Sequence, residues 1–326
     1  MTRGGRWLLP LAVVLLGGGN LFSAEAPPAR KRAEVQAVLD QVRAAAPAGP
    51  LRPLHVVLIA DKKDHGPGEH DYPLWQQRWK ILLGGASPEE AAGAQVNLCG
   101  PPAADPTGKA LKGAPQVKLS TAWQWPSAEQ MQSADLLVMF CYRSGAERRT
   151  WSEERIKDLD AYLSRGGGFV AIHSATYTPG DMSRPEAQQT VGLTGLVFDK
   201  SILVRHGPMT VRIAAPEHPI CRGLPATIEW TDEPYWPPVG DVQAVEVLAT
   251  SEEAVAKGAE ERKPQPMFWT YAKGKGRVFG CVPGHFNWTF DDPLFRLLLL
   301  RGMAWAARES PYRFDELSCR GADLAE

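Results

Sequence analysis

Cysteine, net charge and long apolar runs are all scarce in this sequence, and each scarcity excludes a class of protein. Only five of the 326 residues are cysteines, with no CxxC spacing, which argues against a thiolate metal site of the zinc-finger kind. A formal net charge of −1 gives no reason to expect nucleic acid as a partner. No apolar run reaches the roughly 18 residues of a membrane-spanning helix. Any chemistry must therefore come from local groups of side chains.

Most of the cysteines are expected to be core residues. Cys99, Cys141 and Cys281 lie in or beside apolar, strand-like runs, where a free thiol behaves as a small apolar side chain. Cys221 and Cys319 lie in less regular segments and could form a disulfide or stay free, since connectivity cannot be deduced from sequence.

The N-terminus has the composition of a secretory signal. Arg3 and Arg6 precede an apolar run over residues 7–16, and small residues follow at 23–26. We expect residues 1–25 to be a signal peptide, with an uncleaved amphipathic anchor as the alternative. The mature protein is then exported to a periplasmic or extracellular location and has no integral membrane span.

Apolar patterning predicts one α/β domain over residues 53–310. It follows a leader helix and linker over residues 26–52 and precedes a C-terminal tail over residues 311–326. Continuous apolar runs at 54–60, 135–141 and 169–172 are typical of strands buried on both faces.

Helical patterns lie between these runs. Residues 72–83 carry an apolar stripe, and a capping box is expected at Thr150–Glu153, opening a second helix. The alternation predicts a doubly wound, mostly parallel sheet of the flavodoxin-like kind. The glycines at 166–168 follow a helix and precede a strand, so they indicate a helix end rather than a nucleotide-binding loop.

The second half of the domain is less regular. We expect strands at 210–213, 245–249 and 266–271, a hairpin turn at 273–276 and a final buried helix over 292–308.

Four of the seven histidines follow predicted strands. His65 and His70 lie in the loop after the first strand, His173 directly follows residues 169–172, and His285 lies three residues beyond the strand ending at Val282. Ligands of open α/β sheets bind at the carboxyl ends of the strands, so we expect these histidines to share one pocket. The alternative is that each is a surface or hydrogen-bonded core histidine.

Acidic and aromatic residues accompany the histidines. Asp232, Glu233 and Tyr235 lie in a proline-flanked loop and could orient an imidazole, bind a metal or contact a substrate. His206 and His218 are weaker candidates. A site for Zn²⁺ or Mn²⁺ could be assembled from His65, His70, His173, His285 and Glu233, although their spacing matches no established metal motif.

Tryptophan is abundant, with eleven residues. Several, including Trp288, lie in loop-like segments close to glycine or proline. Their flat faces could stack on sugar rings, or they could anchor loops to the core.

The ordered motifs of this chain resemble the ThuA-like (trehalose utilisation) family, a branch of the class I glutamine amidotransferase-like fold. Amidotransferases carry a nucleophilic Cys at the elbow after a strand, and later a His followed two residues on by Glu. Here those positions hold His173, and His285 followed by Asn287, so glutamine hydrolysis is not expected. The matching stretches are residues 167–175, 218–225, 232–235, 266–269, 274–279 and 284–285.

The resemblance implies a role in carbohydrate utilisation, with a glycoside or keto-glycoside as the small-molecule partner. A 3-keto group acidifies the neighbouring C–H bond, so a base, an acid and an electrophile at the carbonyl could drive elimination or hydration. We expect His173 and His285 to be the acid/base pair and Glu233 to orient one imidazole. We expect the remaining candidates to bind substrate: His65, His70, Asp232, Tyr235 and Trp288. For His65 and His70, metal binding is the alternative.

Two other functions remain open at this point. The chain could be a non-catalytic carbohydrate-binding or accessory module with a degenerate site, or a structural or interaction protein. Its loop aromatics could equally serve a partner subunit in a homo-oligomer.

Overall fold

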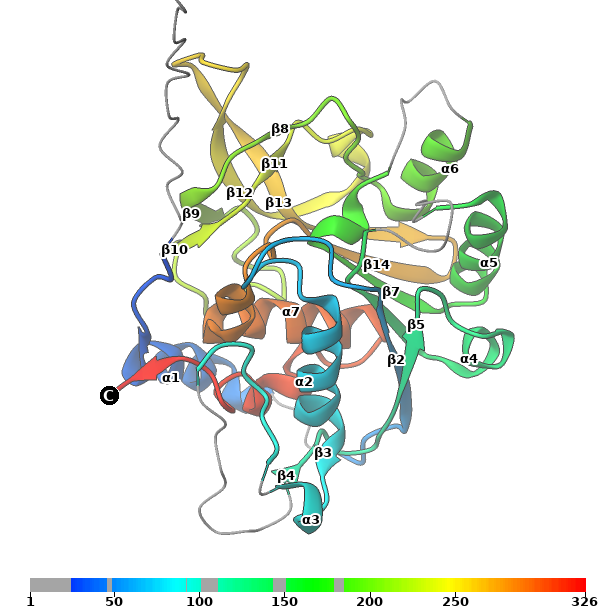
Figure 1. The fold of residues 1–326 in the computed structure, drawn as a ribbon, viewed down its shortest axis with the longest axis vertical. Helices are drawn as coiled ribbons and strands as arrows, with labels where there is room; N and C mark the ends of the chain where they lie inside the picture. The colour runs from blue at the N-terminus through cyan, green and yellow to red at the C-terminus, as the bar shows by residue number, and fades with distance from the viewer. Residues whose placement is uncertain (1–24, 46–48, 92, 101–110, 143–150, 179–184) are drawn as a thin grey trace, which may run out of the picture.

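A nine-stranded sheet with helices on both faces forms the centre of the protein (Figure 1). The computed structural model describes residues 25–45, 49–91, 93–100, 111–142, 151–178 and 185–326. The expected signal peptide, apart from its last residue, lies outside the described residues. The strand order is β10-β9-β12-β13-β14-β7-β6-β2-β5.

The parallel half of the sheet comprises five strands: β2 (Leu54–Ala60), β5 (Val117–Trp123), β6 (Leu136–Met139), β7 (Gly168–Ile172) and β14 (Gly276–Cys281). Every residue of β2, β6 and β7 is buried, as the continuous apolar runs predict for strands covered on both faces. The doubly wound α/β fold is therefore confirmed.

The other half of the sheet is antiparallel and contains β9 (Gly207–Ile213), β10 (Thr227–Asp232), β12 (Glu246–Ala254) and β13 (Arg262–Lys273). Side chains of β9 alternate between buried and exposed, which is the pattern of a sheet with one solvated face. β12 and β13 extend beyond their predicted segments because their outer residues are mostly polar and carry no apolar signal, and β10 was not predicted. Parallel pairing is thus confined to the half of the sheet that contains β7.

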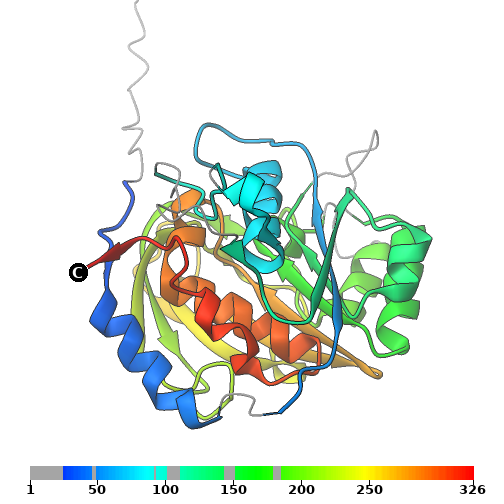
Figure 2. The same cartoon turned by 90° about the horizontal axis from the view of Figure 1, so that it is seen from below.

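Helices cover both faces of the parallel half (Figures 1 and 2). α2 (Tyr72–Gly84) and α7 (Pro293–Ala306) pack on one face, and α4 (Ala128–Ser133), α5 (Glu153–Ser164) and α6 (Pro185–Thr194) lie on the other. None of the helices in the described part of the chain is long and apolar enough to cross a membrane.

The start of α5 differs from the prediction. Ser152, rather than Thr150, is the N-cap, and its side chain accepts a hydrogen bond from the backbone N–H of Arg155. Glu153 is then the first helical residue and pairs with Lys157 instead of closing a capping box. Thr150 lies outside the described residues. Two Ser/Thr signals only two residues apart cannot be ranked from sequence alone.

The leader and the C-terminal segment meet on the surface of the domain. β1 (Arg30–Lys31) pairs with β15 (Leu324–Ala325), and α1 (Arg32–Val42) buries Val35, Val38 and Val42. Residues 311–326, expected as a tail, include a buried 3₁₀ helix, η5 (Pro311–Leu317), that packs against α7.

The remaining elements are short. They are β3 (Gly85–Ala86), β4 (Leu111–Lys112), β8 (Leu203–Val204), β11 (Tyr235–Trp236), α3 (Pro88–Ala91), η1 (Arg43–Ala45), η2 (His173–Thr176), η3 (Val242–Ala244) and η4 (Asn287–Asp291). All five cysteines are free thiols, including Cys221 and Cys319.

Candidate functional site

Three histidines from three strand-end loops meet at the carboxyl edge of the parallel half. His173 begins η2 directly after β7, His285 lies in the loop between β14 and η4, and His70 belongs to the loop between β2 and α2. A backbone hydrogen bond joins the loops that carry His70 and His285: the His70 N–H donates to the His285 carbonyl at 2.9 Å. All three imidazoles are buried.

The nitrogens of these rings converge on the carboxylate of Glu233, which follows β10. His70 Nε2 lies 2.8 Å from His173 Nε2 and 3.0 Å from His285 Nδ1. Glu233 Oε2 lies 3.3 Å from His173 Nε2 and 3.1 Å from His285 Nδ1. We call His70, His173, Glu233 and His285 the His₃Glu cluster; its four ligand atoms all lie within 4.8 Å of one another.

Hydrogen bonds behind the cluster fix which nitrogen faces inward for two of the three rings. His173 Nδ1 lies 2.6 Å from the carbonyl oxygen of Val282, which can only accept, so Nδ1 carries the hydrogen. His70 Nδ1 lies 3.0 Å from the Asp64 carboxylate. The neutral forms of both rings therefore turn an unprotonated Nε2 toward each other.

Charge at the cluster is unusual for a buried site. Burial lowers the pKa of His70 to about 3, although Asp64 opposes the shift. Burial alone would raise the pKa of Glu233, but the neighbouring imidazoles of His173, His206 and His285 hold it well below its usual range. The cluster thus contains a neutral imidazole beside a carboxylate.

Two polar groups outside the cluster hold its members in place. His206 Nε2 donates to the other oxygen of Glu233, Oε1, at 2.6 Å, which leaves Oε2 facing the three rings. Asp64 contacts His70 and also His65, whose Nδ1 lies 2.8 Å from the same carboxylate oxygen. His65 therefore belongs to a neighbouring Asp64–His65–His70 group rather than to the His₃Glu cluster.

A pocket of about 200 Å³ opens onto the cluster. His65, His70, Ser174, Glu233 and Tyr235 form its polar side. Its other walls are aromatic and aliphatic: Tyr142, Tyr177, Ile202 and Val204.

Tyr235 links the pocket to the cluster. Its hydroxyl oxygen lies 2.8 Å from His173 Nε2, and the two rings stack with centroids 4.6 Å apart. Burial and the charge of Glu233 raise the pKa of Tyr235 well above its ordinary value, so the phenol keeps its proton.

Backbone geometry at the elbow agrees with a functional role. His173 has a φ of 47° and His70 a φ of 41°, a region that non-glycine residues seldom adopt. Such strain persists where the surrounding structure imposes it and is concentrated at active sites and ligand sites.

Two expected substrate-binding residues lie away from the pocket. Asp232 is fully buried and accepts hydrogen bonds from the backbone N–H groups of Glu233, Gly284 and His285, so it shapes the loops that present the cluster. Trp288 stacks on Phe286, and its indole N–H donates to the Thr231 carbonyl. Sequence alone does not show whether a loop tryptophan turns its ring toward a ligand or packs it against the protein.

Sequence reasoning overlooked other residues of the site. Asp64 directly precedes His65, and an acid next to a strand-end histidine is a usable signal. His206, between β8 and β9, is only a weak candidate from the sequence. It reaches the site because these strands pair with β11 and β10, and such long-range pairing has no local sequence signal. Ser174, Tyr142 and Tyr177 gave no signal beyond lying near strand ends.

Comparison with known proteins agrees with this architecture. The pattern of the ThuA family, described as trehalose utilisation, matches residues 107–306. A ThuA-like protein of Bacteroides uniformis superposes with a TM-score of 0.53 at 18% identity, covering 82% of this chain and 98% of its own. One from Parabacteroides merdae gives a TM-score of 0.48 at 20% identity, covering 78% and 90%. No curated protein matches. Because the family pattern spans more than half of its length, the chain belongs to the ThuA family, which is associated with carbohydrate utilisation.

Proposed function

We propose that this protein is an exported, metal-dependent enzyme that acts on a glycoside or keto-glycoside. The observation that carries the proposal is the His₃Glu cluster. His70 and His173 turn nitrogens that are unprotonated in their neutral forms toward each other at 2.8 Å. Two such lone pairs repel unless a cation lies between them.

The donor set fits a divalent metal. Ligands about 2.0–2.1 Å from a central ion lie roughly 2.9 Å apart at right angles and 3.3 Å apart in a tetrahedron. The two His–His and two His–Glu separations given above run from 2.8 to 3.3 Å. Imidazole and carboxylate donors suit Zn²⁺ or Mn²⁺. His70, His173, Glu233 and His285 would hold the ion, and His65 would lie outside its ligands.

This assignment changes the roles first expected of the residues. As ligands, His173 and His285 cannot use their coordinating nitrogens for proton transfer, so the acid/base work passes to groups that line the pocket. His65 is one, because Asp64 holds its Nδ1 and leaves Nε2 for the pocket. The Tyr235 hydroxyl, which lines the same pocket, is the other.

A 3-keto-glycoside illustrates the chemistry. When bound, the metal supplies a Lewis acid for a carbonyl oxygen. His65 removes the proton from C2, the electrons of that C–H bond form a C1–C2 double bond, and the C1–O bond to the aglycone breaks. The departing oxygen takes a proton from Tyr235 and leaves as an alcohol. Water then adds across the double bond: its oxygen bonds to C1 as it gives a proton to Tyr235, and His65 returns a proton to C2. Both residues are restored, and the net reaction is hydrolysis.

Thiol chemistry is not available at this site. Cys141 and Cys281 end or follow strands near it, but burial raises the pKa of both thiols, which keeps them protonated and unreactive. The amidotransferase reaction therefore has no nucleophile among the residues that surround the cluster.

Metal content and turnover test the proposal together. Protein purified without chelator is expected to hold about one Zn²⁺ or Mn²⁺ per chain, and to release free sugar from a 3-keto-disaccharide. Dialysis against EDTA should abolish turnover, and the same metal should restore it. Protein that binds no divalent metal, or turns over equally well after chelation, would rule the proposal out. Sugar binding without turnover would instead indicate a non-catalytic module.

Replacing Asp64 with Asn is expected to weaken metal binding about 10- to 100-fold, because this carboxylate orients the ligand His70 from behind. It also holds His65, so turnover should fall further than metal loss explains, even at saturating metal. The matched control is Asp71→Asn in the same loop, since Asn also caps a helix well and Asp71 caps α2. Equal metal affinity in the two variants would contradict the role of Asp64.

A further inference from the structure

The pocket at the His₃Glu cluster changes in polarity along its depth. Its inner end is polar and closed to solvent, because His70, Ser174 and Tyr235 line it and all three are buried. Its outer end is mostly apolar. Val204 lines the pocket and is nevertheless 48% exposed, so it lies where the pocket meets solvent. His65 is the polar side chain at this outer end.

We propose that the outer end of the pocket binds an apolar aglycone, so that the substrate is a glycoside of a cyclic alcohol or phenol rather than a disaccharide. This assignment rests on the proposed function, because it places the reacting sugar ring at the cluster. The preference that it describes is a binding preference, which can be measured without turnover.

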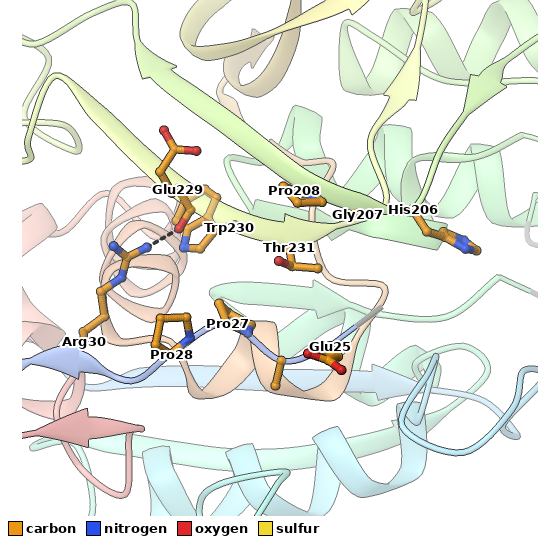
Figure 3. A pocket seen from close by; sticks show the side chains of 11 residues that line it. Glu25, Pro27, Pro28, Arg30, His206, Gly207, Pro208, Glu229, Trp230 and Thr231 are labelled. Carbon is orange, nitrogen blue, oxygen red and sulfur yellow. Dashed lines mark hydrogen bonds between the residues drawn. The ribbon is translucent and has the colours of Figure 1, made fainter. Parts of the chain in front are cut away.

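The size of the pocket leaves the outer end as the place for the aglycone. At about 200 Å³ the pocket is smaller than the roughly 300–1,000 Å³ of pockets for drug-sized ligands, and it suits a single ring. A larger cavity of about 720 Å³, between the leader segment and strands β9 and β10, does not extend it (Figure 3). None of the described residues lines both spaces, and the hydrogen-bonded His206 and Glu233 lie between them.

Two tyrosine rings and two aliphatic side chains form the walls of the outer end, and all four are partly exposed: Tyr142, Tyr177, Ile202 and Val204. Tyr142 and Tyr177 pack edge to face, with ring centroids 5.1 Å apart. Burial raises the pKa of Tyr177 to about 12, and a hydrogen bond with Tyr142 adds to the shift. The two phenols therefore already engage each other.

These walls distinguish an apolar ring from a second sugar. Ile202 and Val204 carry only methyl and methylene groups, so they offer a ligand hydroxyl no partner. A second pyranose would bring hydroxyls against them and lose hydrogen bonds to water without replacing them. An apolar ring in the same place gains from the area that it removes from water.

The leaving-group end of the reaction lies on the same wall. β11 pairs antiparallel with β8, and Tyr235 is directly opposite Val204. Side chains of directly opposite residues extend from the same face of a strand pair, and both of these line the pocket. In the proposed reaction Tyr235 gives its proton to the departing oxygen. The aglycone that carries this oxygen then lies beside Val204.

Charge at the outer end favours a neutral aglycone. None of the described residues that line the pocket is a lysine or an arginine. The carboxylate of Glu233 faces the cluster, 3.1 Å from His285 Nδ1. A phosphate or carboxylate on the aglycone would therefore meet no fixed cation at the outer end.

Three α-glucosides that differ only in the group attached to the sugar test this inference by titration calorimetry, with Zn²⁺ or Mn²⁺ present. Methyl α-D-glucoside has no second ring, cyclohexyl α-D-glucoside has an apolar ring, and trehalose has a ring covered with hydroxyls. We expect the wild type to bind cyclohexyl α-D-glucoside about 10-fold more tightly than either of the others.

Val204→Thr separates the apolar wall from the rest of the pocket, because it keeps a β-branched side chain of the same shape. We expect it to weaken binding of cyclohexyl α-D-glucoside about three- to fivefold, the value of roughly one buried methyl group, and to leave methyl α-D-glucoside unchanged. Val255→Thr is the matched control, since this valine is also partly exposed but lies outside the pocket.

The outcomes separate this inference from the proposed function. Trehalose bound as tightly as cyclohexyl α-D-glucoside, equal losses for the methyl and cyclohexyl glucosides in Val204→Thr, or no binding of any of the three would overturn it even if keto-glycosides turn over. Selective binding of cyclohexyl α-D-glucoside that depends on Val204, in a protein without metal or turnover, would support the apolar outer end and reject the proposed function alone.

Discussion

Replacing His173 with Asn is expected to lower metal affinity roughly 100-fold or more and turnover of a keto-glycoside about 10³-fold. Loss of an outer hydrogen-bond partner already costs 10- to 100-fold in metal affinity, and this change removes a ligand itself. Lewis-acid stabilisation is worth several kcal/mol, which corresponds to the expected loss of rate. Asn is preferred to Ala because it tolerates the positive φ of 47° at this elbow.

Metal-dependent thermal stability provides the readout that separates lost binding from lost folding. A metal that binds only the folded state at 1,000 times its Kd adds about 4 kcal/mol of stability, so the Tm of the wild type should rise on titration. The Tm of His173→Asn should start near that of the metal-free wild type and stay nearly constant up to about 100 times the wild-type Kd, where a 100-fold weaker site adds at most about 0.4 kcal/mol. His218→Asn is the control, since this half-buried histidine lies outside the cluster, with Glu246 3.8 Å away. A metal-induced rise in Tm that persists in His173→Asn would reject the ligand assignment.

The strands and the elbow of this fold could be predicted because their signals are local. Residues 54–60 form a continuous apolar run, and β2 covers the same residues. The glycines after α5 were expected to end that helix, and Gly166 does so with a φ of 108°. His173 directly follows β7, so the end of a buried strand fixed its position at the carboxyl edge.

What could not be predicted depends on the direction of side chains and on distant pairing. The strand-end rule brings His65 and His70 to the same edge, but only the loop conformation turns His70 into the cluster and His65 toward Asp64. Glu233 and Asp232 are adjacent in sequence, but their side chains lie in different places. Glu233 contacts the cluster, whereas Asp232 accepts hydrogen bonds from the backbone of residues 284–285. His206 reaches Glu233 because β9 pairs antiparallel with β10, a register without a sequence signal.

The C-terminal segment shows the same limit. Nothing in the composition of residues 311–326 indicates that they pack against the domain, yet Asp315 forms a buried ion pair with Arg301 of α7. The Arg301 guanidinium is 0% exposed and also donates to the carbonyl oxygens of Ile220 and Arg222. Nitrogen–oxygen distances to the Asp315 carboxylate are 2.8 to 3.2 Å. The buried Arg301 of α7 therefore depends on a carboxylate supplied by η5.

Asp315→Ala is expected to destabilise the protein by about 3–5 kcal/mol, because it leaves the Arg301 charge buried with carbonyl partners alone. For a chain of this size the Tm should fall by on the order of 10 °C. Burial raises the pKa of Asp315 even beside Arg301, so desolvation offsets much of the attraction within the intact pair. The double variant Arg301→Met/Asp315→Leu should therefore regain most of the lost stability.

The exposed pair of Glu153 and Lys157 in α5 provides the contrast, and Glu153→Ala should change stability by less than about 0.5 kcal/mol. Urea unfolding followed by circular dichroism measures all three variants. If Asp315→Ala were no worse than Glu153→Ala, residues 311–326 would contribute little to the fold. The expected large difference would instead place them within the cooperative unit that contains α7, and a truncation at residue 310 would then remove part of the core.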